Sequence, residues 1–204
     1  MVFLFFFAAS CSAQVREVGP TDAGTADGGG IVDAGDAPDA NTSPASCTGF
    51  GECSLTSRTC CGVCGSPTLD DVSAIRWDKV ELYRSVVCGG NGPVPCPACA
   101  SMENPHLTAV CRSSICSAID VRNDTVSACT SNADCMLRYG TGCCETCGVG
   151  LESQLTAFRK DAVQSVVRCL PNEGACPPCV ATYPANASAV CNPRTRRCEV
   201  RVTP

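Results

Sequence analysis

Two C-x-x-C motifs, Cys96-Pro-Ala-Cys99 and Cys176-Pro-Pro-Cys179, have the residue types and spacing that most directly suggest chemistry. Such a pair performs thiol–disulfide exchange when a helix begins at its first cysteine and lowers the pKa of that thiol. The segments that follow both motifs contain proline and show no helical period. We therefore expect both motifs to form structural disulfides.

The same cysteines also allow a metal site. Together with the upstream motifs Cys61-x2-Cys64 and Cys144-x2-Cys147, they would offer four thiolates to Zn²⁺ in each half of the chain. The gap between the motifs exceeds the usual spacing of about 15–20 residues. A zinc site also needs reduced cysteines, whereas the cysteines of an exported chain are oxidised. We expect no metal or other cofactor, and keep metal or thiol handling as an alternative.

His106 is the only histidine and the remaining candidate for acid–base catalysis. It follows Asn104-Pro105 in an expected loop, and no second histidine or G-x-S-x-G sequence accompanies it. We expect a surface histidine, no catalytic residue and a protein that is not an enzyme.

Twenty of the 21 cysteines form two sets of ten with matching order and spacing. The first set reads C-x5-C-x6-CC-x2-C-x23-C-x7-C-x2-C-x11-C-x4-C, and the second reads C-x5-C-x7-CC-x2-C-x21-C-x6-C-x2-C-x11-C-x6-C. This match predicts two tandem homologous modules at 47–120 and 129–204, joined by a linker at 121–128. The cysteines are Cys47, Cys53, Cys60, Cys61, Cys64, Cys88, Cys96, Cys99, Cys111 and Cys116, then Cys129, Cys135, Cys143, Cys144, Cys147, Cys169, Cys176, Cys179, Cys191 and Cys198.

Modules of this size need covalent staples, because a single hydrophobic core is marginal below about 70–80 residues. We expect all twenty cysteines to form disulfides that contribute ~2–4 kcal/mol each. Adjacent cysteines such as Cys60 and Cys61 would strain the peptide if bonded to each other, so we expect each to reach a different element. The pairing stays open, since ten cysteines allow about 945 combinations.

One apolar stripe in each module predicts a helix. In the second module its members recur at three- and four-residue steps, and the first module repeats the pattern over residues 72–87. The members in the second module are Leu151, Leu155, Phe158, Ala162, Val166 and Cys169. Alternating residues near the end of each module predict a β-hairpin, with a turn at 192–197 in the second. The expected fold class is small disulfide-rich α+β, each module being one helix plus a C-terminal β-hairpin with irregular stapled loops.

The amino terminus predicts export. Residues 1–10, MVFLFFFAAS, form an apolar run that suits a signal peptide and is too short for a bilayer, which requires about twenty residues. A basic segment before this run is missing, so we expect the true start to lie upstream of Met1. Cys11 follows a small-residue triplet and is the odd cysteine among 21, which favours lipidation over an unpaired thiol.

Residues 11–46, which include Cys11, predict a disordered tether, because Gly, Ala and Asp dominate and no aromatic residue is present. A flexible coil of this length spans roughly 30–35 Å. The stretch after Cys11 holds six acidic residues and one basic residue, which accounts for the net charge of −5. The remainder is neutral overall, and this excludes a strongly basic nucleic-acid-binding surface.

This arrangement resembles bacterial outer-membrane lipoproteins that join a lipobox, a Gly/Ala/Asp tether and tandem cysteine-rich modules. In that family the cysteine after the small-residue triplet is lipidated, which implies that acyl chains on Cys11 anchor this chain to the membrane. An Asp after that cysteine marks retention in the inner membrane. Ser12 stands there, so the resemblance implies the outer membrane, with a secreted or periplasmic protein as the alternative. It implies no particular activity.

We expect a non-enzymatic cell-envelope protein that displays two rigid modules, either for binding an extracellular or envelope ligand or for a structural role. One alternative is an inhibitor-like recognition domain against secreted enzymes, with a reactive loop in the gaps that differ between the modules. The other is metal or thiol handling by the C-x-x-C pairs. A cluster of arginines in the last turn is expected to be solvated, namely Arg194, Arg196, Arg197 and Arg201.

Overall fold

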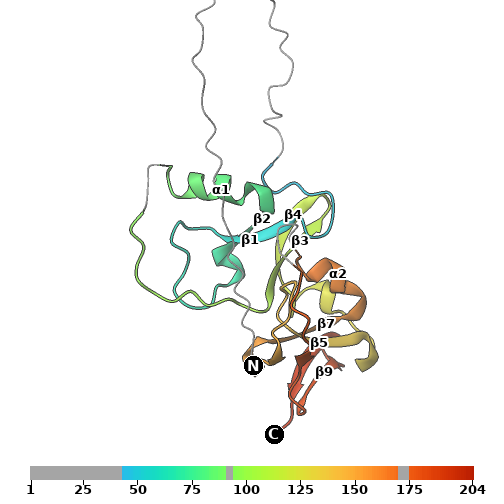
Figure 1. Ribbon diagram of the computed structural model, residues 1–204. Helices are drawn as coiled ribbons and strands as arrows, with labels where there is room; N and C mark the ends of the chain where they lie inside the picture. Colours follow the sequence, from blue (N-terminus) through green and yellow to red (C-terminus); the bar gives the residue numbers. More distant parts are fainter. Residues whose placement is uncertain (1–42, 91–93, 170–174) are drawn as a thin grey trace, which may run out of the picture. The chain divides into compact units, whose positions relative to one another are not determined.

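The structure is a computed structural model that describes residues 43–90, 94–169 and 175–204 (Figure 1). All of them belong to one compact unit. The predicted signal peptide, Cys11 and the tether up to residue 42 lie outside the described residues. Ser46 already forms a β-bridge with Ile115, so the folded part includes the last residues of the range predicted as a tether.

The N-terminal half contains two antiparallel strand pairs. Strand β1 (Cys53–Ser57) pairs with β2 (Val72–Arg76), and β3 (Leu107–Arg112) pairs with β4 (Ile115–Asp120). Helix α1 (Val80–Val87) follows β2. Short 3₁₀ helices occupy Leu69–Asp71, Trp77–Lys79 and, after β4, Thr125–Ser127.

The C-terminal half has the same order of elements. Strand β5 (Cys135–Tyr139) pairs with β7 (Leu155–Arg159), and β9 (Ala187–Asn192) pairs with β10 (Arg197–Val202), both antiparallel. The short helix α2 (Val163–Val166) follows β7. Its 3₁₀ helices are Asn132–Asp134, Glu152–Gln154 and Lys160–Ala162.

Each half also contains a small parallel contact between the loop after the paired cysteines and the loop after C-P-x-C. In the C-terminal half this contact is β6 (Gly148–Val149) against β8 (Ala181–Thr182). In the N-terminal half it is a single bridge between Gly65 and Ser101. The loops that carry the C-x-x-C motifs therefore lie side by side.

The structure confirms a small disulfide-rich α+β fold with two short helices and small hairpins, and the predicted turn between β9 and β10 is present. The predicted long helices are wrong. In the C-terminal stripe, Leu155 and Phe158 lie on β7, and only residues 163–166 form an α-helix. Four of the five residues of β7 are buried, and a strand buried on both faces lacks the period of two that separates strands from helices in a sequence.

The main core lies between the two halves. Val110, Ile119 and Val121 of the N-terminal half pack with Phe158 and Val166 of the C-terminal half, and the last three of these are fully buried. In Figure 1, α2 lies beside the β3–β4 hairpin, and the Oγ1 hydroxyl of Thr108 donates a hydrogen bond to the carbonyl of Val166 at 3.0 Å. The segment 121–128 does connect the halves, but its apolar side chains are part of this core.

Candidate functional site

Ten disulfides join all twenty of the cysteines expected to pair, in the same order in both halves. Counted from the amino end of each half, cysteine one pairs with nine, two with ten, three with six, four with seven and five with eight. The N-terminal bonds are Cys47–Cys111, Cys53–Cys116, Cys60–Cys88, Cys61–Cys96 and Cys64–Cys99. The C-terminal bonds are Cys129–Cys191, Cys135–Cys198, Cys143–Cys169, Cys144–Cys176 and Cys147–Cys179.

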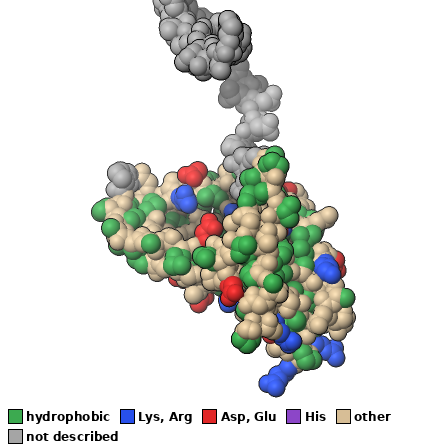
Figure 2. Space-filling model, turned by 60° about the horizontal axis from the view of Figure 1, so that its bottom comes forward, with side chains coloured by type: hydrophobic (Ala, Val, Ile, Leu, Met, Phe, Trp, Pro, Cys, Tyr) green, Lys and Arg blue, Asp and Glu red, His purple; other side chains and the backbone are tan. Residues whose placement is uncertain are grey.

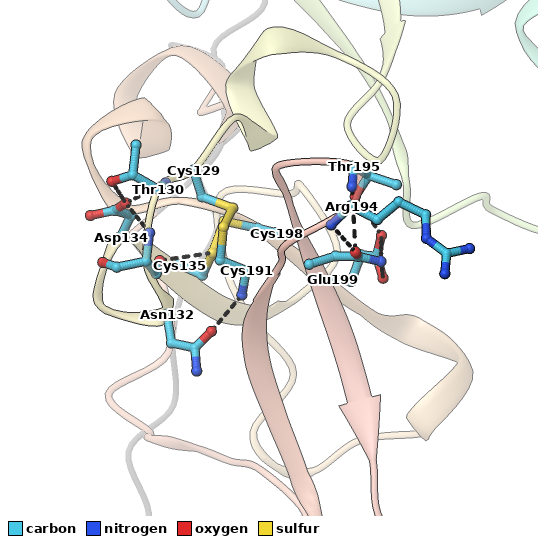
Figure 3. The surroundings of a disulfide bond; sticks show 12 residues. Cys129, Thr130, Asn132, Asp134, Cys135, Cys191, Arg194, Thr195, Cys198 and Glu199 are labelled. Atoms are coloured by element: carbon cyan, nitrogen blue, oxygen red, sulfur yellow. Dashed lines mark hydrogen bonds between the residues drawn. A yellow bond between two sulfur atoms is a disulfide. The ribbon is translucent and has the colours of Figure 1, made fainter.

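Two disulfides in each half form a buried covalent core. Figure 3 shows them in the C-terminal half, where Cys129–Cys191 and Cys135–Cys198 lie next to each other. The chain before β5 is held there by the Asn132 side chain, whose Oδ1 accepts a hydrogen bond from the Cys191 N–H at 2.8 Å. These disulfides replace much of the apolar core that a larger domain would use.

A threonine and an acidic residue fix the turn between the first two cysteines of each half. The Asp134 carboxylate accepts hydrogen bonds from the N–H groups of Thr130 and Ser131 and from the Thr130 hydroxyl (Figure 3). The Thr130 and Ser131 N–H groups lower the pKa of Asp134 to about 2. Thr48 and Glu52 make the corresponding contacts in the N-terminal half. The shared pattern C-T-x3-[D/E]-C was a signal in the sequence that the analysis of cysteine spacing missed.

The C-P-x-C segments are exposed and rigidly held. Cys96 and Cys99 both lie on the surface, and each is bonded to a different cysteine of the Cys61-x2-Cys64 loop. The backbone adds further links, because the N–H of Gly65 donates to the carbonyl of Ala100 at 2.9 Å. Two disulfides and backbone pairing therefore hold each exposed segment in one conformation.

In the C-terminal half, a buried arginine organises the loop of the paired cysteines. The Arg138 side chain, 8% exposed, donates Nη2 hydrogen bonds to the carbonyls of Gly142 and Cys143 at 2.7 and 2.9 Å. Glu145 accepts hydrogen bonds from the Tyr139 N–H and, at 2.6 Å, from the Tyr183 hydroxyl. Burial and the Glu145 carboxylate raise the pKa of Tyr183. Cysteine spacing alone could not reveal these residues.

The loops of both halves border an open cleft of about 1100 Å³. Figure 2 shows a face of the described fold that is hollowed in its middle, with acidic and basic side chains nearby. The cleft lining includes the charged residues Asp71, Arg84, Glu103 and Arg168, and also both pairs of adjacent cysteines. Arg168 spans the halves, because its Nη1 donates to the Ser54 hydroxyl at 3.0 Å.

His106 is half-buried, contrary to the expected surface position, and does not line the cleft. Its Nδ1 atom is buried and has no hydrogen-bond partner among the described residues. Burial, reinforced by the positive charge of Arg122, lowers the pKa of His106. The backbone of His106 holds the loop before β3, because its N–H donates to Asn104 Oδ1 at 3.0 Å and its carbonyl accepts a hydrogen bond from the Val121 N–H at 2.9 Å.

The cysteines do not form the redox pair or the zinc site that were considered as alternatives to structural disulfides. The cysteines within each C-P-x-C motif are not bonded to each other, and all four sulfurs of each proposed zinc set belong to disulfides. The described part of the chain does contain three groups of three cysteines, and within each group the sulfur atoms lie within 4.8 Å of one another. Every member of these groups is disulfide-bonded, so none offers a thiolate.

The tip of the β9–β10 hairpin contains the six-residue gap between Cys191 and Cys198, one of the gaps suggested for a reactive loop because it differs in length from its counterpart in the N-terminal half. The side chains of Asn192 and Thr195 donate hydrogen bonds to Glu199, and the N–H of Arg196 donates to the Asn192 carbonyl across a tight turn. This bond closes the turn at the tip of the hairpin. Arg194, Arg196 and Arg201 are exposed, as expected for a solvated cluster. Arg197 differs from the expectation, because it is half-buried and its Nη1 donates a hydrogen bond to the Asp124 carbonyl.

Within the described ranges, no helix has the length and apolar character needed to cross a bilayer. In comparisons with protein-family models, curated proteins and solved structures, nothing matches this chain.

Proposed function

We propose that this chain is a non-enzymatic, lipid-anchored cell-envelope protein that displays two disulfide-stapled units and binds an envelope or extracellular ligand in the cleft between them. The observation that carries the proposal is the border of the cleft, where disulfide-fixed loops from both halves meet. The matching disulfide order and matching element order of the halves support an origin by duplication of one module.

Rigid borders favour binding because little conformational entropy is lost when a ligand orders them. The volume of the cleft, about 1100 Å³, lies just above the range of about 300–1,000 Å³ for small-ligand sites, so a short peptide or oligosaccharide segment fits the size better than a small metabolite. Asp71 and Glu103 offer acceptors, and Arg84 and Arg168 offer donors, which suits a polar ligand of mixed character.

The membrane location rests on the amino-terminal sequence. Acyl chains on Cys11 would give stable anchoring, and the low-complexity residues 12–42 would separate the folded part from the membrane. Ser12 supports the outer membrane, by resemblance to bacterial lipoproteins. A secreted or periplasmic protein is the alternative location.

Mass spectrometry of the amino-terminal peptide tests the anchor. In a bacterial host we expect an acylated Cys11 peptide, and Cys11→Ala should release the protein from the membrane fraction. Ser12→Asp is the matched control for sorting, and it should leave the acylation intact while moving the protein to the inner membrane. An unmodified Cys11 in the membrane-associated wild-type protein would contradict the anchor.

Site-specific photo-crosslinking tests the cleft independently of the anchor. A photoreactive residue at Glu103, which lines the cleft, should capture a defined partner in intact cells. The same residue at Val149, which is 68% exposed and lies outside the cleft lining, is the control. Equal capture from both positions, or capture from neither, would contradict binding in the cleft.

A further inference from the structure

Six of the ten disulfides lie at the two extremes of burial. Two bonds are buried, Cys53–Cys116 and Cys135–Cys198, and each of their four cysteines is at most 6% exposed. The bonds that carry the C-P-x-C segments have both residues on the surface, namely Cys61–Cys96, Cys64–Cys99, Cys144–Cys176 and Cys147–Cys179. The other four bonds, which include Cys143–Cys169, each have at least one half-buried residue.

One exposed disulfide in the C-terminal half has a third sulfur beside it. The Sγ atoms of Cys143, Cys144 and Cys176 all lie within 4.8 Å of one another. Cys144 and Cys176 are bonded to each other, whereas Cys143 is bonded to Cys169. The Cys143 sulfur therefore lies next to a disulfide of which it is not a member.

The N-terminal half does not share this arrangement, since the described residues Cys60, Cys61 and Cys96 form no such group. The two halves also differ in the residue that contacts the loop of the paired cysteines. Arg138 holds the carbonyl of Cys143 in place, whereas the corresponding position in the N-terminal half is Thr56, whose Oγ1 has no hydrogen-bond partner among the described residues. The two halves thus differ at the loop of the paired cysteines, and the N-terminal half is an internal control.

Access is also unequal within the Cys143–Cys169 bond. Cys169 is exposed, whereas Cys143 is half-buried and held through its backbone by Arg138. This difference favours attack by an external thiolate on the sulfur of Cys169, which would leave the electron pair of the broken bond on the sulfur of Cys143.

We propose that Cys143, Cys144 and Cys176 form a thiol–disulfide exchange site that is opened by a dithiol acting on Cys169. One thiolate of the dithiol bonds to Cys169 and releases the Cys143 thiolate. This thiolate attacks the Cys176 sulfur, forms a Cys143–Cys176 bond and releases the Cys144 thiolate. The second thiol of the reductant then frees Cys169. The dithiol loses two electrons and becomes a disulfide, and Cys144 and Cys169 end as protonated thiols.

Attack on Cys176 is favoured over attack on Cys144, because a disulfide between adjacent residues would strain the peptide that joins them. The exchange transfers the C-P-P-C segment from Cys144 to Cys143 and exposes two thiols. This inference does not rest on the proposed ligand or on the membrane anchor.

The test is timed reduction of the oxidised wild-type protein with about one equivalent of dithiothreitol, followed by alkylation and peptide mapping. We expect alkylated Cys144 and Cys169 together with a linked Cys143–Cys176 peptide. Because the attack is intramolecular, the Cys144–Cys176 bond should disappear at least about tenfold faster than its N-terminal counterpart Cys61–Cys96. Alkylation of Cys143 and Cys169 with Cys144–Cys176 intact would overturn the proposal.

A double variant distinguishes intramolecular exchange from fast reduction that is due only to the exposure of Cys144–Cys176. In Cys143→Ser/Cys169→Ser the attacking sulfur is missing, so Cys144–Cys176 should open at the same rate as Cys61–Cys96. An unchanged fast rate would overturn the proposal. If this variant does not fold, as judged by circular dichroism, Cys144→Ser/Cys176→Ser replaces it. There Cys143 should be alkylated together with Cys169, and protection of Cys143 would contradict the exchange.

Discussion

Cys111 and Cys116 lie directly opposite each other in the β3–β4 hairpin, yet each is bonded to a different residue of the chain that precedes β2. The same relationship holds for Cys191 and Cys198 in the β9–β10 hairpin. The hairpin at the end of each half is thereby joined by two disulfides to the start of the same half. Among the described residues, no disulfide joins the two halves, so their contact depends on non-covalent packing.

Removing a buried disulfide should cost more stability than removing an exposed one. Cys53–Cys116 spans 63 residues and lies in a core, whereas Cys64–Cys99 spans 35 residues at the surface. We expect Cys53→Ala/Cys116→Ala to lower the unfolding free energy by about 3–5 kcal/mol and Cys64→Ala/Cys99→Ala by about 2–3 kcal/mol. Urea unfolding without reductant measures both. A larger loss for the exposed pair would contradict the burial assignment.

The core between the halves should depend on Phe158. This side chain is fully buried among residues of both halves, and truncation leaves a cavity. We expect Phe158→Ala to lower the unfolding free energy by about 3–5 kcal/mol. Leu82→Ala on the exposed side of α1 is the control and should change it by less than about 0.5 kcal/mol. Chemical denaturation compares the two, and equal effects would exclude a core role for Phe158.

Asp134 should make stability depend on acid pH. Its folded pKa of about 2 lies below the ordinary 3.8, so its contribution is fully present above the ordinary value and is lost as the pH falls through the folded value. Asp134→Asn should therefore be less stable than wild type at pH 7, and the difference should shrink as the pH falls from 4 towards about 2. Thermal melts at several pH values measure this.

Asp70→Asn is the matched control for that series, because the Asp70 carboxylate accepts no hydrogen bond from the described residues. Its melting temperature should follow wild type at every pH. A constant difference between Asp134→Asn and wild type down to pH 2 would show that the Asp134 charge does not stabilise the turn.

Gly150 should not tolerate a side chain. A Cβ atom at this position would lie 2.7 Å from Cε1 of Tyr139, whose ring stacks on Tyr183 with centroids 5.3 Å apart. We expect Gly150→Ala to lower the unfolding free energy by about 1–3 kcal/mol, because the stacked rings must shift. Gly49→Ala, where the nearest atom is 3.8 Å away, is the control and should be nearly neutral. Equal stability of both variants would contradict the packing of Tyr139.

The hairpins and the participation of cysteines in disulfides could be predicted because local patterns encode them. Alternation with a period of two marks β9 and β10, and the separate partners of Cys60 and Cys61 follow from the strain of a bond between neighbours. These features depend on residues close together in the sequence, and the structure confirms them.

The remaining features depend on contacts between distant residues. Leu155 and Phe158 belong to the apolar stripe that predicted a helix, but they lie on strand β7, which is buried on both faces. This burial depends on the tertiary fold, because β7 pairs with β5 and Phe158 packs in the core between the halves. Arg138 and Glu145 organise the cysteine loop through backbone groups, and cysteine spacing contains no trace of such contacts. The burial of Val121 likewise depends on the packing of one half against the other.

The most direct test of the disulfide scaffold is peptide mapping, without reduction, of protein purified from its native host, together with a count of free thiols. The account predicts no free thiol among the twenty cysteines from Cys47 to Cys198 and ten bonds in the same order in both halves, with Cys111 joined to Cys47 and Cys116 to Cys53. Several free thiols per half, co-purified zinc, or a bond between Cys96 and Cys99 would contradict it.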